Sequence, residues 1–217
     1  GNRLSIQELF MAFDKDIHAV LLAAGQSTRM GQKNKLLLKI NGIPLVRRTA
    51  INILNSNVVS VTVVTGFDEE EIVNALTGLD VNFVGNPDFR EGLSSSLKAG
   101  LIDLSPSPSA VIVCLADMPK IQPRHINRLL EEYNPSKGYD ICIPTNNGKR
   151  GNPVLIGRRL FKDVFETTGD FGAKNLLQQY PDNIAEVEMG TDDIHFDLDT
   201  QDEFANFINS NISTGIS

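Results

Sequence analysis

The feature that most constrains this chain is a series of apolar, β-branched runs that alternate with segments of helical spacing. We expect strands at residues 17–24, 58–65, 81–84, 110–116 and 139–144. We expect helices at residues 68–77, 94–104 and 123–133. Near-continuous apolar runs separated by helices are typical of βαβ units, whose parallel strands are buried on both faces. The pattern therefore predicts an α/β fold with a mostly parallel central sheet.

The length of the chain is compatible with one large domain. A chain of 217 residues can bury a sizeable core without disulfides or a structural metal. We expect this domain over residues 17–209, after an N-terminal extension over residues 1–16 in which residues 4–13 have the spacing of a short helix. Residues 210–217 are expected to form a flexible tail.

Charge and apolar pattern argue against several classes of partner. The net charge of −7 argues against a protein whose main partner is a nucleic acid, since such domains carry a basic surface. There is no signal segment and no apolar stretch of about 18 residues, so we expect no membrane partner. Cys114 and Cys142 lie in apolar runs and are expected to be reduced and buried. Together these features predict a cytoplasmic protein.

A glycine-rich, basic loop follows the first expected strand. The strand ends in Leu22, Ala23 and Ala24, and the loop then carries Gly25 and Gly31 with the basic residues Arg29, Lys33 and Lys35. Small residues let the backbone approach a ligand closely, and successive free N–H groups form an anion-binding nest. The loop matches neither the P-loop nor the dinucleotide fingerprint. A plain turn with solvated basic residues is the simpler alternative, but the combination of glycines and cations favours a phosphate site.

Carboxylates occur at two places that suit a divalent cation. Asp117 ends the fourth expected strand, and in parallel sheets ligands bind beyond the carboxyl ends of the strands. Asp197 and Asp199 lie on one side of an extended segment, where two carboxylates repel unless a cation or a proton lies between them. The alternatives are a turn or N-cap role for Asp117, and a helix start at Thr200 with Glu203 in the capping-box position.

These segments resemble the motifs of the MobA-like nucleotidyltransferases. The string L-A-A-G-x-S-x-R-M-G-x-x-x-K over residues 22–35 resembles the N-terminal motif of that family, and is similar to its molybdenum cofactor cytidylyltransferase branch in particular. Similar strings lie at residues 86–97, at D-M-P over 117–119, at G-N-P-V-L over 151–155, at G-D-F-G-A-K over 169–174 and at D-L-D-T over 197–200. Two departures are Gln201, where the family has proline, and Asn152, where the cytidylyltransferase branch has histidine. The resemblance implies a Rossmann-like, three-layer α/β/α nucleotidyltransferase fold.

The resemblance also implies a role for each matching residue. Those implied to bind the nucleotide are Leu22, Ala23, Ala24, Gly25, Arg29, Gly31, Lys35, Gly66, Asn86, Ser95 and Ser96. Those implied to face the acceptor are Asn152, Pro153, Asp170, Gly172 and Lys174. Arg29, Lys35 and Asp117 are implied to be catalytic. Asp117 and Asp199 are implied to bind Mg2+, which prefers carboxylates and substrate phosphates, and Asp199 is preferred to Asp197 as the second ligand.

The implied function is transfer of CMP from CTP to a phosphorylated acceptor such as molybdopterin, with release of pyrophosphate and with Mg2+ as cofactor. Three alternatives stay open: GTP as the nucleotide, a sugar phosphate or polyol phosphate as the acceptor, and a non-catalytic nucleotide-binding module that acts as the partner of a molybdoenzyme. Asp117 and Asp199 argue against the last alternative, because binding alone would not require a complete metal site.

Overall fold

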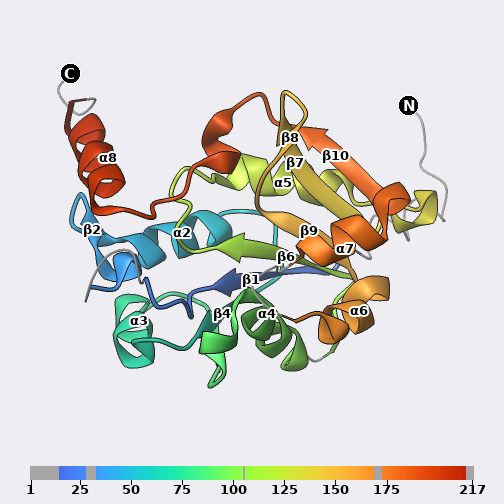
Figure 1. Ribbon diagram of the computed structural model, residues 1–217, viewed down its shortest axis with the longest axis horizontal. Helices are drawn as coiled ribbons and strands as arrows, with labels where there is room; N and C mark the ends of the chain where they lie inside the picture. Colours follow the sequence, from blue (N-terminus) through green and yellow to red (C-terminus); the bar gives the residue numbers. More distant parts are fainter. Residues whose placement is uncertain (1–14, 28–32, 105, 169–172, 214–217) are drawn as a thin grey trace.

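The structure is built on one large mixed sheet (Figure 1). The computed structural model describes residues 15–27, 33–104, 106–168 and 173–213, and the helix expected over residues 4–13 lies outside them. In spatial order the strands are β10 (Ile184–Glu188), β7 (Ile141–Asn146), β9 (Val154–Gly157), β6 (Ala110–Leu115), β1 (Ile17–Leu22), β4 (Val61–Thr65) and β5 (Asn82–Gly85), with β8 (Lys149–Arg150) paired to β7.

Most pairs in this sheet are parallel. β1 pairs in parallel with both β4 and β6, and parallel pairs also join β4 to β5 and β7 to β10. β9 is antiparallel to both of its neighbours, β6 and β7. The carboxyl ends of β1, β4 and β6 therefore meet at one edge of the sheet, where ligands bind in open α/β folds. The predicted fold class is confirmed.

Helices cover both faces of the sheet. They are α2 (Leu45–Leu54), α3 (Glu69–Ala75), α4 (Leu93–Ile102), α5 (Pro123–Glu132), α6 (Phe161–Glu166), α7 (Lys174–Gln179) and α8 (Gln201–Ser213). Figure 1 shows α2 and α5 on one face, and α4 and α6 on the other. Successive side chains of a strand point to opposite faces. Ala19 and Leu21 accordingly pack with α2 and α5, and Val20 and Leu22 pack with α4 and α6.

Every strand and helix that the sequence predicts within the described residues is present, with ends that differ by a few residues. Among the elements that the sequence analysis missed are the hairpin of β2 (Lys39–Ile40) and β3 (Ile43–Pro44), the helix α2, and the strands β9 and β10. The course of β9 follows from the turn before β8. Asn147 and Gly148 both have positive φ, as in the two-residue turns that close hairpins, so the chain reverses after β7 and returns antiparallel.

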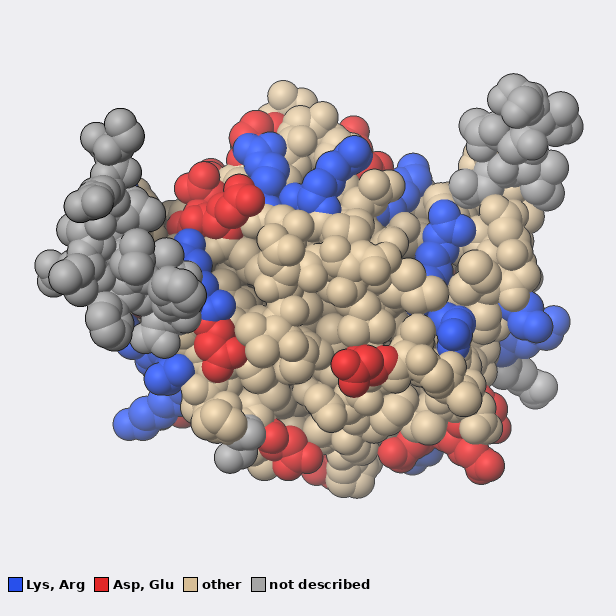
Figure 2. All heavy atoms as spheres, turned by 180° about the vertical axis from the view of Figure 1, so that it is seen from behind, with Lys and Arg blue, Asp and Glu red and all other residues tan. Residues whose placement is uncertain are grey.

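Helix length, surface charge and the two cysteines bear on what the sequence predicts about partners and disulfides. No helix among them is long and apolar enough to cross a membrane. On the described part of the face drawn in Figure 2, Lys and Arg side chains form separate small groups with acidic groups between them, which is unlike the continuous basic surface of a nucleic-acid-binding domain. Cys114 and Cys142 are free and buried, as predicted, and burial raises the pKa of each thiol to about 12.

Gly100 sets the distance between α4 and the sheet. A Cβ at this position would lie 2.5 Å from Cγ1 of Val20 and 3.0 Å from Cγ2 of Val64. Alanine in an open helical position stabilises by about 0.5–1 kcal/mol relative to glycine, whereas overpacking a core costs about 1–3 kcal/mol. We therefore expect Gly100→Ala to lower the free energy of unfolding by about 1–2 kcal/mol in urea denaturation. Lys98→Ala on the same helix is the control, with a change within about 0.5 kcal/mol. A more stable Gly100→Ala variant would contradict the close packing.

Candidate active site

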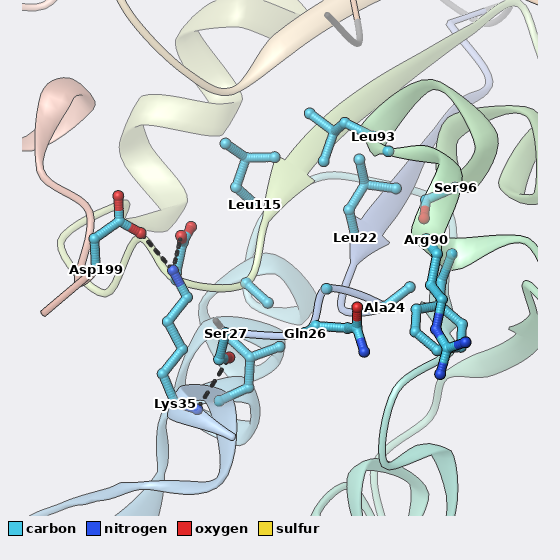
Figure 3. Close-up of a pocket in the computed structure, with 16 residues that line it drawn as sticks. Leu22, Ala24, Gln26, Ser27, Lys35, Arg90, Leu93, Ser96, Leu115 and Asp199 are labelled. Carbon is cyan, nitrogen blue, oxygen red and sulfur yellow. Dashed lines mark hydrogen bonds and ion pairs between the residues drawn. The ribbon is translucent and has the colours of Figure 1, made fainter. Parts of the chain in front are cut away.

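A cavity of about 540 Å³ lies at the carboxyl ends of β1 and β6 (Figure 3). Residues predicted from the sequence that line it are Leu22, Ala24, Gly25, Lys35, Ser96, Asp117 and Asp199. They come from the loop after β1, the start of α4, the end of β6 and the segment before α8. The cavity therefore lies at the carboxyl ends of the strands, where the sequence predicts that a ligand binds.

Lys35 joins the two distant carboxylates at one end of the cavity. Its Nζ atom donates to Oδ2 of Asp117 at 2.7 Å and to Oδ1 of Asp199 at 2.6 Å. The side chains of Lys35 and Asp117 are 14% and 19% exposed, so solvent screens this pair less than it screens a surface ion pair. Burial by itself lowers the pKa of the Lys35 ammonium, but the attraction of Asp117 and Asp199 outweighs it and the pKa lies above its ordinary value.

The loop after β1 is folded so that Lys35 points back toward β6. Lys35 begins a short 3-10 helix, η2 (Lys35–Leu37), and Asn34 caps it by accepting a hydrogen bond from the backbone N–H of Leu36 at 3.0 Å. Ser27, with a φ of 49°, accepts from the backbone N–H of Lys35 at 3.2 Å and donates to Oδ1 of Asn34 at 3.5 Å. These bonds close the loop on itself and fix the root of the Lys35 side chain.

Asp199 is brought to Asp117 by backbone contacts. The N–H of Leu198 donates to the backbone carbonyl of Asp117 at 3.0 Å, which ties the segment before α8 to the end of β6. The N–H groups of Asp199 and Thr200 both donate to Oε2 of Glu203 at 2.9 Å, and the N–H of Glu203 donates to Oγ1 of Thr200 at 3.2 Å. The helix start predicted at Thr200 is thus confirmed, and Asp199 immediately precedes it.

Three carboxylates form a cluster that suits a divalent cation. One oxygen each from Asp117, Asp197 and Asp199 lies within 4.8 Å of the other two. Burial, and then the negative charges of Asp199 and Asp117, raise the pKa of the Asp197 carboxyl above its ordinary value. Carboxylates so close together are stabilised by a cation, and carboxylate oxygens are the ligands that Mg2+ prefers. The residues present therefore fit such an ion.

Other predicted residues lie behind the cavity. Ala23 is buried in the core, and Gly66 is covered by Phe89, because a Cβ there would lie 2.7 Å from the Cβ of Phe89. Asn86 is buried and donates to Oγ of Ser95 at 2.9 Å and to Oγ of Ser96 at 3.0 Å. Of these two serines only Ser96 lines the cavity, and the Ser95 hydroxyl also lies within hydrogen-bonding distance of backbone carbonyls.

Those residues predicted to face the acceptor that the structure describes do not line the cavity. Asn152 and Pro153 precede β9, whose Val154 is paired with Val113 near the end of β6, so both lie at the edge that carries the cavity without lining it. Lys174 begins α7 and does not line it either. Four further predicted residues, Arg29, Gly31, Asp170 and Gly172, lie outside the described residues.

Several lining residues were not predicted. They include Gln26, Ser27, Phe89, Arg90, Leu93 and Leu115. Phe89 and Gly92 belong to the string at residues 86–97, which was a signal for this wall of the cavity. Ser27 is the serine of the string over residues 22–35, so the sequence carried a signal for it, although no role was predicted. Arg90 carried no signal, because a lone arginine in a loop looks like an ordinary solvated residue in a sequence.

Known proteins share both the sequence pattern and the fold. Nicotine blue oxidoreductase from Paenarthrobacter nicotinovorans is 28% identical over 86% of this chain and 94% of its own length. A probable molybdenum cofactor guanylyltransferase from Natronomonas pharaonis is 34% identical over 58% of this chain and 59% of its own length. The molybdenum cofactor cytidylyltransferase from Escherichia coli K12 is 23% identical over 87% of this chain and 93% of its own length.

Solved structures agree with the fold. A nucleotidyl transferase from Methanothermobacter thermautotroptrophicus has a TM-score of 0.79 at 24% identity, over 92% of this chain and 99% of that one. Rv0371C from Mycobacterium tuberculosis H37Rv, in a complex with manganese, has a TM-score of 0.74 at 20% identity, over 90% of this chain and 99% of that one. The sequence profile of the MobA-like NTP transferase domain matches residues 19–184. The chain therefore belongs to the MobA-like NTP transferase domain family.

Proposed function

We propose that this protein transfers a nucleoside monophosphate from an NTP to a phosphorylated acceptor, with release of pyrophosphate and with Mg2+ as cofactor. The observation that carries the proposal is the convergence of Lys35, Asp117 and Asp199 at one end of the cavity. A cationic side chain and a carboxylate cluster together match the charges of a metal-bound triphosphate. In the reaction an oxygen of the acceptor phosphate attacks the α-phosphorus, and the bond from that phosphorus to the oxygen that bridges to the β-phosphate breaks.

The residues of this chain have mainly a positioning and electrostatic task. Asp117 and Asp199 would hold Mg2+, with Asp197 beside them. When bound, the ion would supply a Lewis acid and a template for the phosphate oxygens. Lys35 would bind the triphosphate as a mobile point charge, and the backbone N–H groups of the loop after β1 would surround it. We propose that Arg29 stabilises the departing pyrophosphate.

CTP is the favoured nucleotide and molybdopterin the favoured acceptor. The cytidylyltransferase relative matches 87% of this chain at 23% identity and the guanylyltransferase relative 58% at 34%, so the likeness to the cytidylyltransferase extends over more of the chain. We assign the acceptor to the side of the cavity next to Asn152 and Pro153, with Asp170, Gly172 and Lys174 contributing from the next segment. A molybdoenzyme that receives the product is a further partner that this function would require.

An oxidoreductase is the second candidate function. It is favoured by the likeness to nicotine blue oxidoreductase over 86% of this chain. The carboxylate cluster argues against it, because hydride transfer to or from an organic cofactor does not require three converging acidic side chains.

A panel of nucleotides distinguishes these candidates. We expect CTP with Mg2+ to raise the melting temperature more than GTP, UTP or ATP. A ligand at 100 times its dissociation constant stabilises by about 2.7 kcal/mol, which corresponds to a shift of several degrees for a domain of this size. NADH and NADPH are expected to give no shift. Stabilisation by NADPH and by no triphosphate would favour the oxidoreductase instead.

Two variants test the charged residues directly. Loss of one preorganised electrostatic contact commonly lowers the rate by about 10²–10³, so we expect losses of that size for Lys35→Ala and for Asp117→Ala. The measurement is pyrophosphate release from CTP with molybdopterin as acceptor. Lys98→Ala is the matched control, because Lys98 is on α4 and does not line the cavity. Normal turnover by the Lys35→Ala or Asp117→Ala enzyme, with the fold intact by circular dichroism, would refute the assignment.

Substitutions of Lys35 and of Asp117 should change the affinity for a divalent cation in opposite directions. Lys35 and a divalent cation compete for the same two carboxylates. Without nucleotide, Lys35→Ala should therefore bind Mn2+ about tenfold more tightly than the natural protein, because the competing charge is gone. Asp117→Asn should bind it more weakly. Electron paramagnetic resonance of free Mn2+ measures both affinities, and equal affinity in all three proteins would show that the cluster is not the metal site.

A further inference from the structure

Arg90 lies at the end of the cavity opposite to Lys35. In Figure 3 Lys35 and Asp199 occupy one side of the view and Arg90 occupies the other, with Gln26 and the apolar side chains of Leu22, Leu93 and Leu115 between them. Apolar side chains do not solvate phosphate oxygens. A triphosphate held by Lys35 would therefore stay at the Lys35 end, and the opposite end is free for another part of the nucleotide.

The side chain of Arg90 is exposed, and its guanidinium lies over the ring of Phe89. The Cζ atom of Arg90 lies 5.6 Å from the centroid of the Phe89 ring, a cation–π distance. Phe89 is itself fixed from behind, because Gly66 leaves room for it and the ring of Phe67 lies 6.4 Å away, centroid to centroid. Asn86 accepts from the N–H of Asp88 at 3.0 Å and thereby fixes the start of the same segment. The ring beneath Arg90 is thus held by contacts of its own.

The guanidinium is not engaged by an acidic partner within the described part of the chain, where its recorded contact is the one with Phe89. A guanidinium offers five N–H donors in a planar fork and no acceptor. Such a fork is satisfied best by two acceptors side by side, as a carboxylate or a base edge presents them. A fork that faces a cavity, with its stacking partner fixed, is suited to recognise one edge of a planar ligand.

Only some nucleobases present two adjacent acceptors. Guanine has O6 and N7, the pair that arginine contacts in DNA, and cytosine has O2 and N3. In adenine an amino group lies beside N7 and beside N1, and in uracil an N–H lies between the two carbonyl oxygens. We propose that Arg90 determines base specificity by binding the paired acceptors of cytosine or guanine. The inference rests on the proposed function, which places a nucleoside triphosphate in this cavity.

The test measures binding rather than turnover. Isothermal titration calorimetry with Mg2+ gives affinities for the α,β-methylene analogues of CTP, GTP, ATP and UTP, and for inorganic tripolyphosphate, which has no base. A bidentate contact contributes about 1–3 kcal/mol of discrimination, so Arg90→Ala should lose about 10-fold to 100-fold in affinity for the CTP or GTP analogue that the natural protein prefers. Affinity for the ATP and UTP analogues should change less than threefold or so, and affinity for tripolyphosphate should not change.

Two further variants sharpen this experiment. Arg90→Lys keeps the charge and loses the fork, so it should share the loss of selectivity. Arg128→Ala, at an exposed position on α5 away from the cavity, should leave all affinities unchanged. Equal weakening of all four nucleotides and of tripolyphosphate by Arg90→Ala would show a phosphate contact and overturn the inference, as would unchanged selectivity. Failure of the natural protein to bind any triphosphate would instead overturn the proposed function, and the inference with it.

Discussion

The double ion pair of Lys35 is the interaction on which the site depends. Its two carboxylate partners are 82 and 164 residues away in the sequence, so no local structure can bring them together. Parallel pairing of β1 with β6 places the end of one strand beside the end of the other, and the backbone bond from Leu198 to Asp117 adds the third segment. Like charges placed so close would repel each other without a cation. The fold tolerates their convergence because Lys35 is there to neutralise them.

The sheet explains why the two ends of the cavity differ in chemistry. Lys35, Asp117 and Asp199 come from the segments that leave the sheet at β1 and β6 and from the segment before α8, while Phe89 and Arg90 come from the connection between β5 and α4. Residues Leu22 and Leu115 lie between them at the last positions of their strands. A linear ligand with a highly charged part and a flat aromatic part fits this gradient. The gradient follows from strand order, and loop sequence then determines which ligand is preferred.

Much of the fold and the charged end of the site could be predicted from the sequence, because both depend on residue type and on strand ends. Asp117, Lys35 and Asp199 each follow or precede a recognisable element, and parallel strands send their carboxyl ends to one edge. The predictions failed where the direction of a side chain or the position of a strand is determined only in the folded protein. Ser95 and Ser96 look equivalent as letters, yet only Ser96 faces the cavity. The turn Asn147-Gly148 is a recognised hairpin signal and was overlooked. The insertion of β9 between β6 and β7 had no local signal, since only pairing across the sheet determines it.

The capping box at Thr200 and Glu203 makes the acidic cluster depend on the first turn of α8. All eight strands of the sheet precede residue 189, so the backbone around Asp199 is held by a helix that follows the last strand. Oε2 of Glu203 accepts from the N–H groups of Asp199 and Thr200, and unwinding of this turn would release both. Phe204 and Phe207 on the same helix are buried in the core, and their packing therefore stabilises the position of a carboxylate at the cavity. The stability of α8 is in this way linked to the charge of the site.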